Sequence, residues 1–213
     1  LNITGKGRCN VTNDADLNTL LANTPKNGRF LYSVFSRFDG RDAMSFFEEM
    51  GVPLKVERGG RVFPVSDRSF DVSGALERRL KSLRVSLVRD RAVDLEIEDH
   101  EVRGVSGERR RYAAQAVILA TGGISYPATG STGDGHRMAE RAGHTVTPLQ
   151  GSLVPLQGTL DNGASCARLQ GLGLRNVGLT VFENQKKIYT DLGELLFTHF
   201  GVSGPLVLSA SAH

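Results

Sequence analysis

The sequence predicts an α/β fold in which a parallel sheet is interrupted by an antiparallel β-meander, followed by part of a mostly β domain. The hydrophobic period changes from 3.6 to 2 near residue 83, which indicates helices followed by half-buried strands. A continuous apolar run over residues 116–120 ends in glycines, as expected of a strand buried on both faces of a parallel sheet. The character changes again after Pro148, so we expect one domain over residues 1–150 and another over 151–213.

Two amphipathic helices are expected in the first part of the chain. One covers Arg41–Met50, with Asp39 placed to cap its start and Gly51 placed to end it. The other covers about Asp71–Leu83, with apolar residues along one side and charged residues along the other. Residues 1–13, ahead of both helices, form a polar loop that contains glycine.

The antiparallel meander is expected after these helices. Apolar and polar residues alternate over 83–87 and 93–98, and Val102 and Val105 follow a turn near Asp99-His100. Such alternation is typical of strands that have one face in the core and one in water. The pattern therefore predicts three or four short antiparallel strands.

The last part of the chain contains two further strand-like segments. These are residues 149–160 and 177–190, and the second segment folds back on itself at Glu183-Asn184-Gln185. A glycine-rich loop over His199–Pro205 then precedes a final apolar segment. In this loop, Ser203 is a candidate helix cap, since a proline follows in what would be the first helical turn.

Composition and charge exclude several classes of protein. The 39% hydrophobic and 23% charged content is that of a globular protein. The net charge is only +3 and most basic residues are interleaved with acidic ones, so we expect no nucleic-acid partner. Two cysteines without a CxxC pair and five scattered histidines argue for a reducing compartment and against a metal site. Without an apolar run of about 18 residues we expect no membrane span, and a cytoplasmic location.

A first motif with chemical meaning is Thr121-Gly122-Gly123, at the end of the apolar run 116–120. At the carboxyl end of a parallel strand, glycine lets the backbone pass close to a pyrophosphate or a flavin. The order of helix, meander, buried strand and glycine-rich exit resembles FAD enzymes of the two-dinucleotide-binding type, in which this strand end lies beside the cofactor. Alone the motif is a modest signal, because many α/β sheets end in glycine.

A second motif is the segment Thr129–Ala139, with the sequence TGSTGDGHRMA. It is similar to the TGDGxxMA segment of flavoproteins related to succinate dehydrogenase and fumarate reductase, and it opens a helix expected over Gly133–Gly143. A helix N-terminus offers unpaired N–H groups and partial positive charge, which suit an anionic flavin. The alternative is a surface helix that is capped by Ser131 or Asp134 and binds nothing.

The most specific motif is the N-terminal loop Leu1–Asn13, with the sequence LNITGKGRCNVTN. It resembles the (I)SGKGRCN(V)TN loop of a family of bacterial flavoproteins related to the bile-acid dehydro-reductases, with Thr4 in place of the more usual serine. In that family the loop lies along the FAD. The resemblance implies that Arg8 pairs with the pyrophosphate and that Gly5 and Gly7 allow the backbone to approach it.

The resemblance covers essentially the whole chain and implies FAD as the cofactor. Val93, at the start of the meander, would contact the adenine through its backbone. For Cys9, the role of a small packed residue is favoured over that of a nucleophile, because no histidine or second thiol is near it in the sequence. The family-like run over 193–205 makes Thr198, His199 and Ser203 candidates for substrate contact. No catalytic residue is identified. The expected cofactor contacts are Gly7, Arg8, Cys9, Asn10, Asn13, Val93, Thr121, Gly122, Gly130, Gly133 and Asp134.

The leading hypothesis for function is a flavoprotein oxidoreductase that uses FAD for hydride transfer with a small organic substrate, with NAD(P)H as a candidate donor. Reduction of a conjugated enone and oxidation of a small amine both fit. The alternative is a non-catalytic flavin-fold module, and a third hypothesis, an RNA-associated flavoprotein, rests only on the pI near 9.0. The GxGxxG turn of the family is not found in residues 1–213, so we expect a fragment that holds part of a cofactor site.

Overall fold

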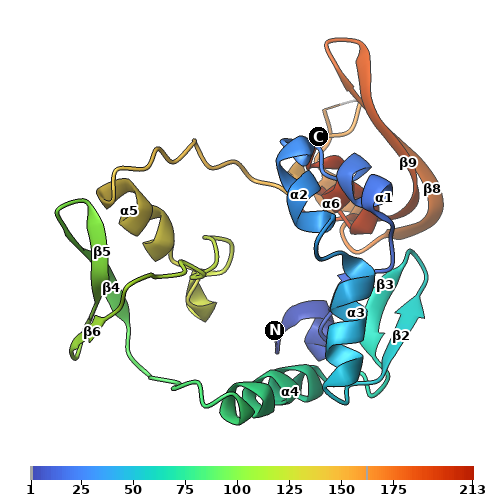
Figure 1. The fold of residues 1–213 in the computed structure, drawn as a ribbon. Helices are drawn as coiled ribbons and strands as arrows, with labels where there is room; N and C mark the ends of the chain where they lie inside the picture. Colours follow the sequence, from blue (N-terminus) through green and yellow to red (C-terminus); the bar gives the residue numbers. More distant parts are fainter. Residues whose placement is uncertain (1, 162) are drawn as a thin grey trace. The chain divides into compact units, whose positions relative to one another are not determined.

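The computed structural model describes residues 2–161 and 163–213 (Figure 1). Leu1, the first residue of the expected loop, lies outside the described residues. The chain divides into two compact units. Unit 1 contains the residues up to Val85 together with Gly151–His213, and unit 2 contains Ser86–Gln150. Each unit is described by itself below. Among the described residues, no helix is long and apolar enough to cross a membrane.

The first part of unit 1 is a small helical and β assembly. Its sheet has the order β1-β3-β2, and both ladders are antiparallel. Helix α3 contacts β1 and β2, and helix α4 contacts β3 (Figure 1). The elements are η1 (Thr4–Gly7), β1 (Thr12–Asn13), α1 (Leu17–Ala22), η2 (Gly28–Leu31), α2 (Tyr32–Phe35), α3 (Gly40–Glu49), β2 (Leu54–Glu57), β3 (Arg61–Pro64) and α4 (Ser69–Ser82).

Both helices predicted for this region are confirmed. At the start of α3, Asp39 accepts hydrogen bonds from the N–H groups of Arg41 and Asp42, and Asp42 completes a capping box. Gly51 ends the helix with φ +80°, and the N–H of Val52 donates to the carbonyl of Phe47. This pattern is a Schellman motif, in which glycine takes the left-handed conformation that other residues avoid.

The strand expected over residues 83–87 is wrong, because these residues terminate α4. Arg84 has φ +55°, and the N–H of Val85 donates to the carbonyl of Leu80 at 3.0 Å. A Schellman motif built on Arg84 therefore uses the backbone groups that a strand would need. The alternation of Leu83, Val85 and Leu87 did not reveal this, since the residue in the left-handed position is not glycine.

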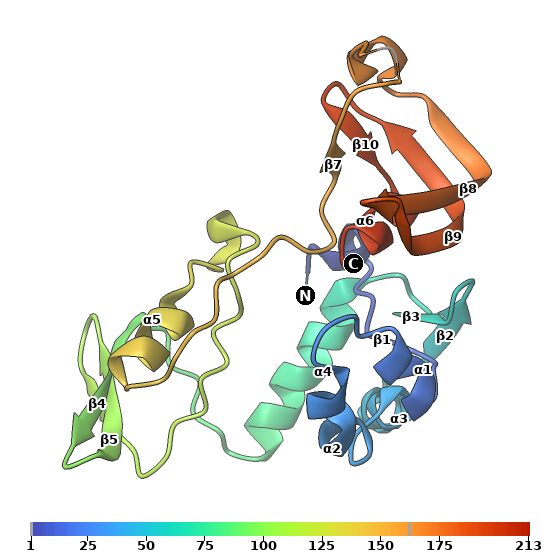
Figure 2. The same cartoon turned by 90° about the horizontal axis from the view of Figure 1, so that it is seen from above.

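The second part of unit 1 is a sheet of order β7-β10-β9-β8 with antiparallel ladders, on which α6 packs against β9 (Figure 2). The long hairpin confirms the fold expected at residues 183–185, because Asn184 and Gln185 both have positive φ, at 47° and 65°. The elements are β7 (Leu156–Gln157), η4 (Cys166–Leu169), β8 (Gly173–Glu183), β9 (Lys186–Phe197), β10 (Gly201–Ser203) and α6 (Pro205–Ala210).

Two details of this region differ from the sequence-based expectation. The strand expected over 149–160 is reduced to β7, which has two residues, because only these pair with β10. The cap expected at Ser203 is also wrong: Ser203 lies in β10, and Gly204, with φ +98°, is the N-cap of α6. Pro205 does occupy the first turn of α6, where a missing N–H costs nothing.

Unit 2 contains the meander that the sequence predicts. Its sheet has the order β4-β5-β6, and Asp99 and His100 form the turn between the first two strands with φ 51° and 63°. Helix α5 contacts β4, and Gly143, with φ +91°, follows the C-cap residue of the helix. The elements are β4 (Ala92–Glu98), β5 (Glu101–Gly107), β6 (Arg111–Ala113), η3 (Pro127–Thr129) and α5 (Asp134–Arg141).

The buried parallel strand expected over residues 116–120 is not formed. No described residue pairs with this segment, Ile118 is 92% exposed, and every ladder among the described residues is antiparallel. A strand exists only where a second strand satisfies its backbone N–H and C=O groups. The apolar composition of the run is a property of the segment, whereas its hydrogen bonds depend on a neighbour.

Candidate functional site

The N-terminal loop of unit 1 is held in an unusual backbone conformation. Gly5 and Gly7 have φ of +56° and +84°, and two residues with side chains, Lys6 and Cys9, have φ of +60° and +62°. At Gly5 a Cβ atom would lie 3.0 Å from the Phe63 ring. At Gly7 the nearest atom to such a Cβ would be 3.9 Å away, so the backbone of the loop is open on that side.

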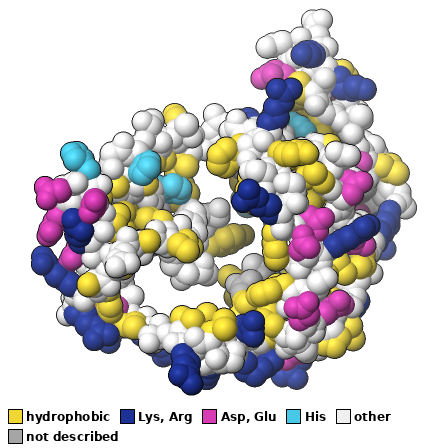
Figure 3. Space-filling model, in the orientation of Figure 1, with side chains coloured by type: hydrophobic (Ala, Val, Ile, Leu, Met, Phe, Trp, Pro, Cys, Tyr) yellow, Lys and Arg dark blue, Asp and Glu magenta, His cyan; other side chains and the backbone are white. Residues whose placement is uncertain are grey.

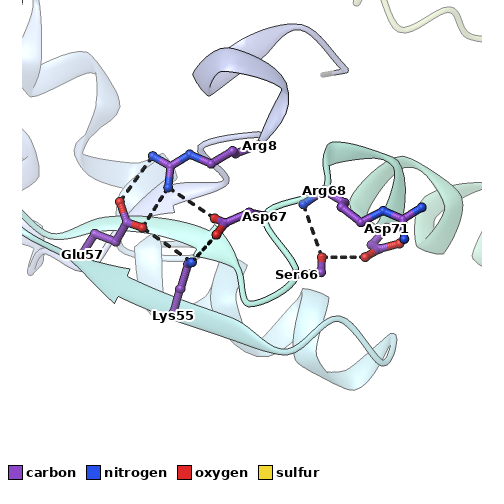
Figure 4. Close-up of polar contacts among 7 residues, drawn as sticks. All are labelled: Arg8, Lys55, Glu57, Ser66, Asp67, Arg68 and Asp71. Carbon is purple, nitrogen blue, oxygen red and sulfur yellow. Dashed lines mark hydrogen bonds and ion pairs between the residues drawn. The ribbon is translucent and has the colours of Figure 1, made fainter.

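Arg8 is the centre of a charged cluster that also contains Lys55, Glu57 and Asp67 (Figure 4). Its Nη1 lies 2.8 Å from Glu57 Oε1 and 3.2 Å from Asp67 Oδ1, and its Nη2 lies 3.3 Å from Glu57 Oε2. The guanidinium carbon is 4.0 Å from the centroid of the Phe63 ring, a cation–π contact. Lys55 Nζ binds Asp67 Oδ2 at 2.6 Å. The planar fork of Arg8 is therefore shared between two carboxylates.

The cluster changes the ionisation of its members. The hydrogen bond from Arg8 lowers the pKa of the Glu57 carboxyl, and the hydrogen bond from Lys55 lowers the pKa of the Asp67 carboxyl. In return, the hydrogen bond to Glu57 raises the pKa of Arg8. The four side chains are between 29% and 42% exposed, so water partly screens the cluster.

Asn10 and Asn13 fasten the loop to the neighbouring sheet. With its amide oriented to donate, the Asn10 nitrogen lies 2.9 Å from the Thr12 carbonyl oxygen and 3.1 Å from that of Val62. Asn13 Nδ2 donates to the carbonyl of Gly59 at 2.8 Å. A Cβ at Gly60 would lie only 2.6 Å from Asn13 Oδ1, so the turn between β2 and β3 fits closely around this side chain.

Cys9 is buried in the core beneath the loop. Its side chain is 1% exposed and clusters with Val52, Val72 and Ala75. This is the small packed residue that the sequence favours over a nucleophile. The side chains of Arg8, Cys9, Asn10 and Asn13 are thus all engaged within unit 1.

In unit 2 the two glycine-rich motifs lie against one another. The N–H of Gly133 donates to the carbonyl of Gly123 at 3.3 Å, and a Cβ at Gly135 would overlap Thr121 Oγ1. Gly122, Gly130 and Gly133 have φ of +75°, +95° and +75°, which favour glycine at each position. The structure therefore brings the expected cofactor residues of these motifs together within one unit.

The N-terminus of α5 has no side-chain cap. Gly133 is its N-cap, so the caps expected at Ser131 or Asp134 are wrong. Asp134, in the first turn, accepts from Thr132 Oγ1 at 2.9 Å and also contacts Arg91 and Arg137. The Thr132 hydrogen bond is the main reason that the pKa of the Asp134 carboxyl is lowered. His136 Nδ1 is buried without a hydrogen-bond partner.

Val93 lies where the register of β4 against β5 shifts, between Ala92 and Asp94. Its carbonyl accepts a hydrogen bond from Arg141 at 3.0 Å, and Arg141 also pairs with Asp94 at 2.8 Å. At the N-terminal end of α5, Asp134 lies 3.4 Å from Arg91, which directly precedes β4. Seven helical residues rise about 10.5 Å and three strand residues about 10 Å, so these two ion pairs align α5 along β4.

The structure adds residues that the motifs did not indicate, namely Lys55, Glu57, Asp67, Arg91 and Arg141. Lys55 and Glu57 have one local signal, because a spacing of two places both on the same face of β2. Of the residues expected to meet substrate, Thr198 has a buried Oγ1 without a partner, and the ring of His199 lies edge-on to Phe200. No group of three or more metal-ligating side chains occurs in residues 2–161 and 163–213.

A family comparison defines the class of the protein. Residues 1–207 match the family described as the HI0933-like protein Rossmann domain, which is nearly the whole chain, and the protein belongs to this family. The expected α/β class agrees with a Rossmann-type domain that mixes helices and strands.

Individual relatives narrow the comparison. The chain is 32% identical over 99% of its length to the 3-dehydro-bile acid delta(4,6)-reductase of Clostridium scindens, of which it covers 50%. It is 30% and 28% identical to the ribosomal RNA dihydrouridine synthases of Haemophilus influenzae and Escherichia coli, covering 51% of each. The chain therefore spans about half the length of the curated relatives it matches.

Proposed function

We propose that the protein is an FAD-dependent oxidoreductase that reduces a carbon–carbon double bond conjugated to a carbonyl group. The observation that carries this proposal is that both kinds of relative are named for saturating such a bond. In a 3-dehydro bile acid, the Δ4 and Δ6 bonds are conjugated with the 3-oxo group. Formation of dihydrouridine saturates the uracil C5–C6 bond, which is conjugated with the C4 carbonyl.

Several features of unit 2 support a dinucleotide cofactor. Gly122, Gly130 and Gly133 keep the backbone free of side chains beside the N-terminus of α5, which lacks a side-chain cap. Unpaired N–H groups at a helix N-terminus favour negatively charged groups. We propose that Thr121 and Asp134 complete this surface, and that Val93 contributes backbone contacts at the register shift of β4.

In unit 1 we propose that the loop meets FAD mainly through its backbone near Gly7. The side chains of Arg8, Asn10 and Asn13 are engaged by carboxylates and carbonyls of their own unit. Arg8 would then be a positioning residue, because a guanidinium already shared by Glu57 and Asp67 presents no vacant fork to a pyrophosphate. Cys9, Asn10 and Asn13 would fix the loop in the conformation that leaves space beside the Gly7 backbone.

When bound, FAD would supply the hydride equivalent for the reduction. The reaction adds a hydride to the β-carbon and a proton to the α-carbon of the conjugated system, with NAD(P)H as the proposed source of electrons. The chain contributes orientation of the cofactor through its glycine-rich loops. We assign no described residue as the proton donor.

The test uses protein expressed from its complete reading frame. We expect the supernatant of the denatured protein to show a flavin spectrum at near-stoichiometric amount. Anaerobic incubation with NADPH or NADH and either a 4,6-dien-3-one bile acid or a uridine-containing RNA should then add two hydrogen atoms to one substrate, as seen by mass spectrometry. Colourless protein that added FAD does not stabilise would refute the proposal. Retained flavin without reduction of either substrate would favour a non-catalytic flavin module.

A further inference from the structure

We infer that one surface of unit 1 binds single-stranded RNA, an inference that rests on the proposed function and selects a substrate class for it. The surface is formed by α1, η2, α2 and the turn after α2. Over residues 17–38 the sequence has three basic residues and no acidic one, a net charge of +3. The exposed basic and aromatic residues of this segment are called the basic–aromatic surface, and they are Lys26, Arg29, Phe30, Tyr32, Arg37 and Phe38.

The aromatic rings of this surface are unusually accessible. Phe30 is 79% exposed, Tyr32 56% and Phe38 50%. Exposed rings beside cations are what proteins use to stack the bases of single-stranded nucleic acids, because every base has a π-face. Phe38 is also held in place, since its ring meets Phe46 edge-on at 6.3 Å and Phe46 meets Phe47 edge-on at 5.3 Å. Because Phe47 packs on the buried core cluster, the ring of Phe38 is connected to the interior through Phe46 and Phe47.

The two arginines of this surface differ from the other arginines discussed above in their ion pairing among the described residues. Within the described ranges, no carboxylate lies at ion-pair distance from Arg29 or Arg37. Arg8, Arg91 and Arg141, by contrast, each pair with a carboxylate. Arginine without an internal partner, beside exposed rings, favours a polyanion that also carries planar groups.

A hollow beside Arg29 and Tyr32 is large enough for a nucleotide. It has a volume of about 620 Å³ and is lined by Leu21, Ala22, Gly28, Arg29 and Tyr32. One cation and one ring therefore face the same open hollow. This combination suits a base that stacks on Tyr32 while the phosphate next to it contacts Arg29.

An RNA-binding surface departs from the expectation that the protein has no nucleic-acid partner. That expectation rested on the small net charge and on the interleaving of most basic residues with acidic ones. The segment 17–38 departs from this balance because no acidic residue occurs between Asp16 and Asp39.

A second basic area of unit 1 provides a control. Figure 3 shows Lys and Arg side chains gathered over α4, where Arg78, Arg79 and Lys81 are exposed. Only Phe70, near the start of α4, is a ring on this helix, and it lies two helical turns from Arg78. General attraction between basic residues and RNA would depend on both areas equally, whereas base stacking depends on the basic–aromatic surface.

The test measures RNA affinity and flavin content in the same preparations of protein from the complete reading frame. Fluorescence anisotropy with a labelled single-stranded oligouridylate gives the affinity over a range of salt concentrations. We expect Phe30→Ala to weaken binding about tenfold. Arg29→Ala with Arg37→Ala should lower the slope of log affinity against log salt by about 1.4, from about 0.7 for each phosphate. The control double variant Arg78→Ala with Arg79→Ala should change RNA affinity less than Arg29→Ala with Arg37→Ala does. In the control background, Phe30→Ala should still cause its full loss of affinity.

Several outcomes would overturn the inference. These are an absence of RNA binding by flavin-loaded protein at low salt, equal losses from the two arginine pairs, and no loss from Phe30→Ala. Strong protection of residues 28–38 from hydrogen exchange without RNA would show that other polypeptide covers the surface, and would also overturn it. Protein that binds RNA but no flavin would refute the proposed function alone, so the two failures are distinguishable.

Discussion

Replacing Cys9 by alanine and by glycine tests whether this residue is a strained part of the core. Its side chain is 1% exposed and its φ is +62°. Cys9→Ala removes one buried group of about the size of a methylene and should destabilise by about 1 kcal/mol. Cys9→Gly removes a second such group, about 0.8 kcal/mol, and adds about 0.5–1 kcal/mol of unfolded-chain entropy.

Glycine, however, also relieves the left-handed backbone, which costs a residue with a side chain about 1–2 kcal/mol. The gain and the extra losses nearly cancel, so we expect the glycine and alanine variants to agree within about 0.5 kcal/mol. At an ordinary φ the glycine variant would be less stable by about 1.5 kcal/mol. The matched control is Ala75→Gly in the middle of α4, which has no such strain to relieve and should cost about 2 kcal/mol.

The assay is urea unfolding followed by far-UV circular dichroism, since the chain has no tryptophan. Hydrogen exchange of residues 4–11 reports on the loop itself. A Cys9→Gly variant that is less stable than Cys9→Ala by 1.5 kcal/mol or more, the difference expected at ordinary φ, would refute the reasoning. So would a rate of flavin reduction that falls in both variants while stability is unchanged, because that result requires the thiol to act at the cofactor.

Two further predictions concern the site. Gly135→Ala should destabilise unit 2 by about 1–3 kcal/mol despite the higher helix propensity of alanine, because the new Cβ overlaps Thr121 Oγ1. Gly123→Ala, which meets no atom within 4 Å, is the control, and equal denaturation midpoints for the two variants would contradict the packing. The stability difference between the wild type and Glu57→Gln should shrink as pH falls below about 4.5. The lowered pKa of Glu57 means that the native state binds fewer protons, so its contribution is present above the unfolded-state pKa and lost in acid. Urea titrations between pH 6 and pH 3 check this, and a constant difference would exclude the role of the Arg8 pair.

Local signals in the sequence were sufficient for the helices and hairpins. Asp39 with Gly51, and the turn at Asp99-His100, specify their elements through contacts only a few residues apart. Residues 116–120 and 149–160 failed as strands because a strand needs a partner, which its own residues do not encode.

The candidate site, like the fold, was predictable from the sequence only where the signals are local. The left-handed glycines of unit 2 were predictable, since glycine-rich motifs indicate such backbone. The partners of Arg8 were not, because Glu57 and Asp67 lie 49 and 59 residues away along the chain. The motif indicated that the side chain mattered, and only the fold showed that carboxylates surround it.

The uncharged stretch around Ile118 has a consequence for the handling of this polypeptide. No charged residue occurs between Arg111 and Asp134, and residues 116–120 make no backbone hydrogen bonds to other described residues. A short, β-prone, proline-free run with open N–H and C=O groups is a template for intermolecular cross-β pairing. Whenever this run is unpaired, during synthesis or refolding, it is where we expect aggregation to begin. Charged residues close to this run oppose such aggregation. They lie only on its N-terminal side, where the nearest is Arg111.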